Sequence, residues 1–85
     1  MLKEKQLEII EQVYQKIKNE YPESELGKIS FNDNDTWVDV LVPDQLVDNE
    51  ELDKLIVHQV FSILQNYGYP IQFYAVPKQE ARVVA

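Results

Sequence analysis

Apolar residues recur every three or four positions along the first twenty residues, a spacing that predicts an amphipathic helix over residues 2–20. Its apolar stripe consists of Leu7, Ile9, Ile10, Val13, Tyr14, Ile17 and Tyr21. Lys, Glu and Gln occupy most of the other positions, and all three residue types favour helices. Pro22 disfavours a helical backbone at the residue before it, so we expect the helix to end by Tyr21.

Two segments after this helix alternate polar and apolar residues with the period of a half-buried strand. They are residues 28–32 and residues 36–42, and a polar connection over residues 22–27 leads to the first of them. Asn and Asp fill the turn at residues 32–35, and both favour tight turns by hydrogen-bonding their own backbone. The two segments therefore predict a β-hairpin. A third strand is expected over residues 71–76, since Pro77 ends the apolar run there.

A second helix is predicted over residues 49–67, with a signal at each end. Asp48 with Glu51 three positions later fits a capping box, and Gly68 fits a left-handed C-cap. The apolar positions are Leu52, Leu55, Ile56, Val57, Val60, Phe61, Ile63, Leu64 and Tyr67. They span about 240° of the helix surface, whereas a helix with one side in water needs little more than about 100°. The excess must be covered, either by the first helix packed alongside or by some other element.

The order helix, strand, strand, helix, strand predicts an α+β fold, a two-layer sandwich with both helices on one face of a small sheet. Residues 1–77 are expected to form a single domain. The tail, residues 78–85, is polar and then apolar, so it either adds an edge strand or frays. The sheet then has three strands, or four if the tail joins it.

Alternation along residues 36–42 separates two faces of the second strand. Its three valines suit the side beneath the helices, so Trp37, Asp39 and Leu41 are expected on the open side. Tyr74 and Val76 of the third strand are expected to face the same way. The candidate interface therefore consists of Trp37, Asp39, Leu41, Tyr74 and Val76. The alternative is that the tail or the first helix folds over these residues and makes them core.

Composition argues against several kinds of chemistry. The chain has 85 residues with no Cys and one His, which excludes disulfides, thiolate metal sites and thiol nucleophiles. The acids Asp33 and Asp35 lack the ligand spacing of a calcium loop. His58 is expected on a solvated helix surface, without the pocket that a catalytic histidine needs. We therefore expect no cofactor, no metal and no catalytic residue, and a protein that is not an enzyme.

The net charge of −7 is unevenly distributed along the chain. Residues 29–53 carry eight acids and no base, and such a negative pole repels nucleic-acid phosphates and attracts basic partners. No apolar run is long enough to span a membrane, and the first residues are charged where a signal peptide would be apolar. Neither nucleic acid nor membrane is therefore expected as a partner, and we expect a cytoplasmic location.

Two functions fit this pattern. The first is a non-catalytic protein-interaction module that forms a homo-oligomer through its open aromatic face, because exposed apolar surface marks binding sites and Trp and Tyr dominate interface energetics. Oligomerisation would also add to the limited core of so small a domain. The alternative is an acidic inhibitor or immunity-type protein that binds a basic site on its partner.

Overall fold

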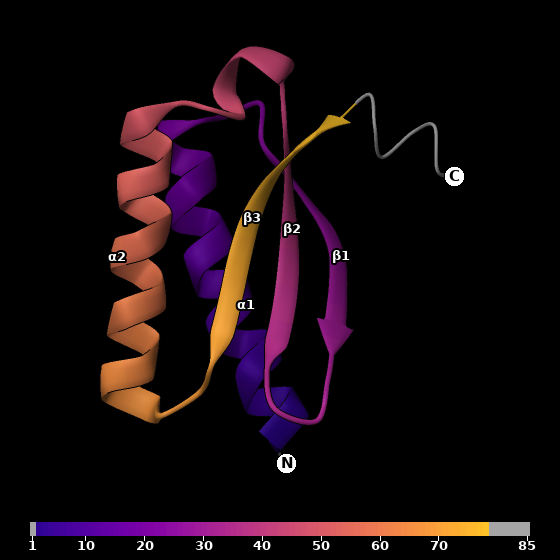
Figure 1. Ribbon diagram of the computed structural model, residues 1–85, viewed down its shortest axis with the longest axis vertical. Coiled ribbons are helices and arrows are strands. Elements are labelled where there is room, and N and C mark those ends of the chain that lie inside the picture. Colours follow the sequence, from indigo (N-terminus) through magenta and orange to yellow (C-terminus); the bar gives the residue numbers. More distant parts are fainter. Residues whose placement is uncertain (1, 79–85) are drawn as a thin grey trace.

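The computed structural model describes residues 2–78 and has the predicted element order, α-β-β-α-β (Figure 1). The elements are α1 (Leu2–Glu20), β1 (Glu25–Phe31), β2 (Thr36–Val42), the short 3-10 helix η1 (Asp44–Leu46), α2 (Glu50–Tyr67) and β3 (Ile71–Pro77). The predicted α+β class is therefore confirmed. The tail that we expect to add a strand or to fray lies outside the described residues from position 79 onward.

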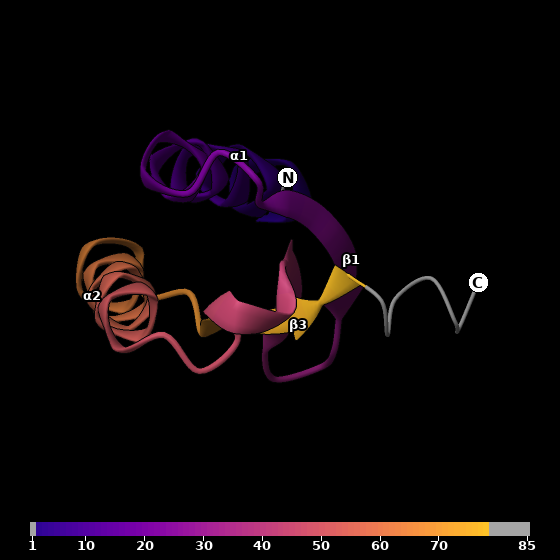
Figure 2. The same cartoon turned by 90° about the horizontal axis from the view of Figure 1, so that it is seen from above.

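The three strands form one mixed sheet in the order β1-β2-β3. The predicted hairpin pairs β1 with β2 in antiparallel fashion, whereas β2 and β3 run parallel. A parallel pair needs a long crossover, which α2 supplies. Figure 2 shows that α1 crosses one face of the sheet and that α2 runs beside the β3 edge. Within residues 2–78 no helix covers the opposite face, which we call the open face.

The hydrophobic core lies between the two helices and the sheet. Val38, Val40 and Val42 of β2 are fully buried there, as the alternation predicts. The rest of the core consists of Ile9, Ile10, Val13 and Ile17 from α1, Leu52, Ile56 and Ile63 from α2, and Ile71 and Phe73 from β3. Because β2 is buried on one face only, its register is well determined: a slip of one residue would expose the three valines and bury Trp37.

Two polar contacts connect α1 to the other elements. The hydroxyl of Thr36, buried at the start of β2, donates to Oε1 of Gln6 at 2.6 Å. Nζ of Lys16 donates to Oε1 of Gln59 at 3.4 Å, and Gln59 is a buried residue of α2. A buried polar group without a partner is costly, so these contacts favour one position of α1 over others.

The predicted start of β1 is wrong, because the strand begins at Glu25 and not at residue 28. Glu25 pairs with Leu41, so part of the expected polar connection belongs to the sheet. The register shifts between Leu26 and Ile29, where an irregularity interrupts the strand. Such a bulge breaks the period-two alternation, and this is why the earlier residues do not look like a strand in the sequence.

Two details of the helices also differ from expectation, whereas the end of α2 agrees. The N-cap of α2 is Asn49 and not Asp48, since Oδ1 of Asn49 accepts a hydrogen bond from the backbone N–H of Leu52 at 2.9 Å. Leu7, expected in the apolar stripe of α1, is 44% exposed. Gly68 has φ 75° and ψ 14°, which confirms the predicted left-handed C-cap.

Candidate functional site

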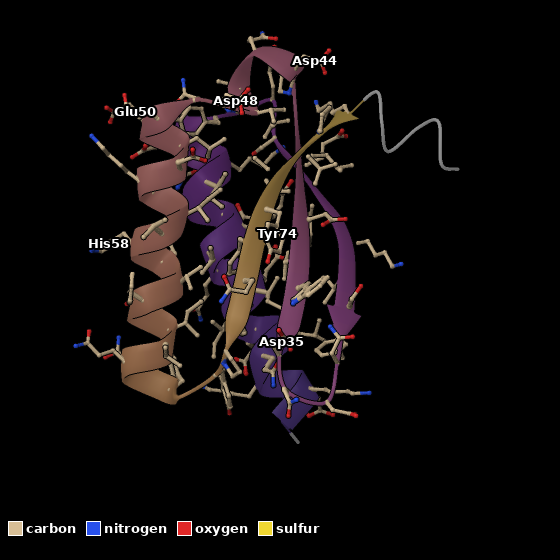
Figure 3. All side chains as sticks on the ribbon, viewed as in Figure 1. Asp35, Asp44, Asp48, Glu50, His58 and Tyr74 are labelled. Atoms are coloured by element: carbon tan, nitrogen blue, oxygen red, sulfur yellow. The ribbon has the colours of Figure 1, made fainter. Side chains whose placement is uncertain are left out.

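An aromatic pair occupies the open face. The rings of Trp37 on β2 and Tyr74 on β3 lie 6.0 Å apart between centroids at an interplanar angle of 74°, an edge-to-face arrangement that aromatic pairs prefer. Trp37 is 47% exposed and Tyr74, labelled on β3 in Figure 3, is 46% exposed. The prediction that the indole points away from the helices, opposite in direction to its valine neighbours, is confirmed.

The indole of Trp37 is held by the hairpin turn. Its Nε1 donates to Oδ2 of Asp35 at 2.9 Å. The other oxygen of that carboxylate accepts from Nδ2 of Asn32 at 3.4 Å, and the backbone N–H of Asn32 donates to the carbonyl of Asp35 at 2.8 Å. Because these contacts restrict the rotation of the side chain, Trp37 has less conformational entropy to lose when a partner binds.

Leu41 and Val76 continue the apolar surface toward the other end of the strands. They are register partners on β2 and β3, and both are half-buried. Leu41 lies close to β1, because a Cβ atom added to Gly27 would stand only 3.0 Å from its Cδ2 atom. Beyond them a salt bridge of 3.5 Å joins Lys78 to Glu25, the residue that pairs with Leu41. The apolar part of the open face therefore ends in a charged rim.

Asp39 places a carboxylate among these apolar side chains. It lies between Trp37 and Leu41 along β2, pairs in register with Tyr74, and is half-buried. A carboxylate that loses its water must gain a hydrogen-bond donor or a cation, or the interface pays a desolvation penalty. The five predicted site residues thus share one face of the sheet, and Asp39 determines which partners suit it.

Prediction from the sequence missed a second group of exposed apolar side chains, on α2. Val57 is 52% exposed and Phe61 is 65% exposed, and Leu64 and Tyr67 are exposed as well. They belong to the excess arc of the α2 stripe, and α1 does not cover them although the two helices contact each other. The sequence signal for these residues is the width of the apolar arc. The width alone does not show which part of the arc remains exposed.

The candidate chemistry noted in the sequence remains dispersed. His58 lies on the exposed side of α2, away from the sheet (Figure 3). Of the two acids in the hairpin turn, Asp35 accepts hydrogen bonds from Asn32 and Trp37, as described above. Among residues 2–78, no group of three or more His, Asp or Glu side chains is arranged so that it could hold a metal ion.

Comparison of the chain with protein-family models, with curated proteins and with solved structures found no match. None of the helices within residues 2–78 combines the length and the apolar character needed to cross a membrane. The open face, the exposed side of α2 and the distribution of charge are the features of the molecule that bear on its function.

Proposed function

We propose that the protein is a non-catalytic protein-interaction module that forms a homodimer through its open face. The observation that carries this proposal is the exposed pair of Trp37 and Tyr74 on the face that no helix within residues 2–78 covers, with Leu41 and Val76 beside it. Trp and Tyr are the side chains whose burial contributes most at protein interfaces. A contiguous apolar surface of this kind is uncommon on a protein that functions as a monomer.

The dimensions of the molecule suit such an interface. A specific complex buries about 800 Å² on each partner, whereas this protein exposes 5814 Å² in total. The molecule measures 34 × 28 × 18 Å, and Figure 1 looks down its shortest axis onto the broad side that carries the open face. One broad side is therefore large enough for a standard interface. Dimerisation would also enlarge the core of a chain that has no disulfide to stabilise it.

Charge makes a prediction about the salt dependence of this dimer. Each copy carries a net charge of −7, so two copies repel each other at low ionic strength. Asp39 also enters the interface in both copies and adds a like-charge contact where no cation compensates it. Salt screens this repulsion, and dimerisation should therefore become tighter as the salt concentration rises. Replacement of the carboxylate by an amide, Asp39→Asn, should tighten it too.

The test measures molar mass by size-exclusion chromatography with light scattering over a range of protein concentrations. The wild type should change from monomer to dimer with rising concentration, and Trp37→Asp should stay monomeric. Leu7→Asp is the matched control, because Leu7 is exposed to a similar extent but lies on α1. Trp37 is the single tryptophan, so its fluorescence should shift to shorter wavelength as the dimer forms. A wild type that remains monomeric at high protein and salt concentrations would contradict the proposal.

The alternative function, an acidic inhibitor of a basic partner, predicts the opposite effect of salt. Attraction between unlike charges weakens when salt screens it, so capture of a basic partner should fade as the salt concentration rises. The cluster of acids near the start of α2, with Asp44, Asp48 and Glu50 labelled in Figure 3, is the feature that supports this alternative. A cytoplasmic location is part of either proposal and is tested by fractionation of the native cell.

A further inference from the structure

We propose that a groove between α2 and β3 binds a basic amphipathic helix of another protein. We call it the α2–β3 groove, and its lining includes Val57, Phe61 and Leu64 of α2, which are exposed, with the half-buried Gln72 and the exposed Tyr74 of β3. It adjoins the open face, with which it shares Tyr74. The proposal goes beyond self-association, since apart from Tyr74 it concerns other side chains, and it concerns a partner of different chemistry.

The α2 side of the groove carries an apolar row with helical spacing. Val57, Phe61 and Leu64 follow one another at intervals of four and three residues, so they lie along one side of the helix. Asp53, four residues before Val57, continues this row toward the N-terminus of α2. A ridge of this kind next to a groove is the surface into which the side chains of a second helix interdigitate.

The charges that line the groove determine which helix would fit. Among residues 2–78 these charged side chains are Asp48 and Asp53, and both are acids near the N-terminal end of α2. The hollow on the other side of Val57 and Phe61 adds Glu50 and one cation, Lys54. A helix that combines an apolar stripe with lysines or arginines would bury the stripe against the row and pair its cations with these carboxylates.

A second copy of this chain fits the groove less well. The first turn of α2 contains Glu50, Glu51 and Asp53, and its last turn contains no basic residue. Two α2 helices packed in parallel would place acids against acids, and two packed antiparallel would bring no cation from α2 to Asp53. Like charges across an interface cost affinity, so a basic partner is favoured over self-pairing at this site.

Fluorescence anisotropy with three labelled peptides, each as long as α2, tests the charge and apolar requirements separately. The first peptide has leucines on one helical face and lysines on the other. The second replaces its lysines with glutamates, and the third replaces its leucines with serines. We expect the leucine–lysine peptide to bind at least about tenfold more tightly than either of the others, because only it meets both requirements. Equal affinity for the leucine–glutamate peptide, or for the serine–lysine peptide, would overturn the proposal.

Protein variants then locate the bound peptide. Phe61→Ser should weaken binding of the leucine–lysine peptide by about tenfold, the effect of losing one buried aromatic contact. Asp53→Lys should weaken it severalfold and reduce its dependence on salt. Leu7→Ser, the control on α1, should leave affinity unchanged. Trp37→Asp, the dimerisation variant, should change affinity less than Phe61→Ser does, because Trp37 adjoins the groove only through its contact with Tyr74. Circular dichroism of each variant verifies that it is folded.

The outcomes distinguish this site from the open face. If Trp37→Asp abolishes peptide binding and Phe61→Ser does not, the peptide occupies the open face and the groove is not the site. If Phe61→Ser dissociates the homodimer and Trp37→Asp leaves it intact, a second copy occupies the groove. The open-face dimer and the groove as a site for another protein are then both wrong. If the wild type is a monomer that binds the peptide through Phe61, the groove proposal stands without the dimer.

Discussion

The two glycines of the chain are needed for different reasons, and substitutions can separate them. A Cβ atom at Gly27 would lie 2.9 Å from the carbonyl oxygen of Asp39 and 3.0 Å from Cδ2 of Leu41. Gly68 instead has φ +75°, and beyond the glycine and its two chain neighbours no atom lies within 4 Å of the added Cβ. Gly27 therefore makes room for a neighbouring strand, whereas Gly68 permits a backbone conformation that other residues adopt at a cost.

The expected magnitudes follow from these geometries. Ordinary contact begins at 3.4 Å, so alanine at position 27 requires a movement of 3.4 − 2.9 = 0.5 Å between β1 and the backbone of β2. Overpacking of this kind costs about 1–3 kcal/mol, and the lower entropy of the unfolded alanine chain offsets about 0.4–1 kcal/mol of it. We expect Gly27→Ala to lower the free energy of unfolding by about 1–2 kcal/mol. Gly68→Ala should lower it by about 1–2 kcal/mol through left-handed strain alone.

Asparagine distinguishes the two causes, because it tolerates the left-handed conformation but is larger than alanine. Gly68→Asn should be less destabilising than Gly68→Ala, whereas Gly27→Asn should be at least as destabilising as Gly27→Ala. Urea unfolding followed by far-UV circular dichroism, at one protein concentration for all variants, gives the four free energies. The same ranking of alanine and asparagine at both positions would refute the assignment of a steric role to one glycine and a torsional role to the other.

Three further predictions concern stability, each measured by the same urea unfolding. Gln6→Ala should lower the free energy of unfolding by about 1 kcal/mol, because the buried Thr36 hydroxyl loses its acceptor. In a Thr36→Val background the same substitution should have little effect, and equal effects in both backgrounds would exclude this coupling. Asn49→Ala should lower the free energy of unfolding by about 1 kcal/mol and Asp48→Ala by clearly less, because Asn49 is the N-cap. The reverse order would instead support Asp48 as the cap, in a capping box with Glu51. Val40→Ala should lower the free energy of unfolding by about 2 kcal/mol, because it removes two buried methyl groups from the core. A change near zero would mean that neighbouring side chains fill the cavity.

The sequence was most informative where several signals agreed. In β2 the alternation, the β-branched residues and the proline after Val42 all indicate one strand with one buried face, and both its bounds and the direction of Trp37 are as predicted. At the start of α2, Asp48 and Asn49 are both good caps, and the pattern of side chains favours Asp48 because of Glu51. In the structure Asn49 has the extended backbone of an N-cap, with φ −71° and ψ 122°, and its side chain accepts from the backbone N–H of Leu52. The pattern of side chains alone does not distinguish between two adjacent capping residues.

The start of β1 could not be predicted because its pairing is not local. Leu26 pairs with Val40 and Ile29 with Val38, so three steps along β1 match only two steps along β2. The alternation is out of phase across this irregularity, and residues before Gly27 read as a polar connection. The information that makes them a strand lies in β2, whose free backbone groups on that side need partners.

The exposed apolar residues of the two candidate surfaces can be tested without confusion from unfolding. Large effects on stability come from buried positions, whereas substitutions at exposed ones usually change the free energy of unfolding by less than about 0.5 kcal/mol. Phe61 is more exposed than any other large apolar residue in the described part of the chain, and Trp37 has its indole on the open face. The contribution of Phe61 to folding is therefore small, whereas Trp37 also contributes its hydrogen bond to Asp35 and its ring contact with Tyr74. Burial of either ring at an interface would remove apolar area that now contacts water. Phe61→Ser should therefore be as stable as the wild type, whereas Trp37→Asp should be less stable but still folded, and both should differ from the wild type in association. A variant that instead unfolds would mean that its side chain belongs to the core.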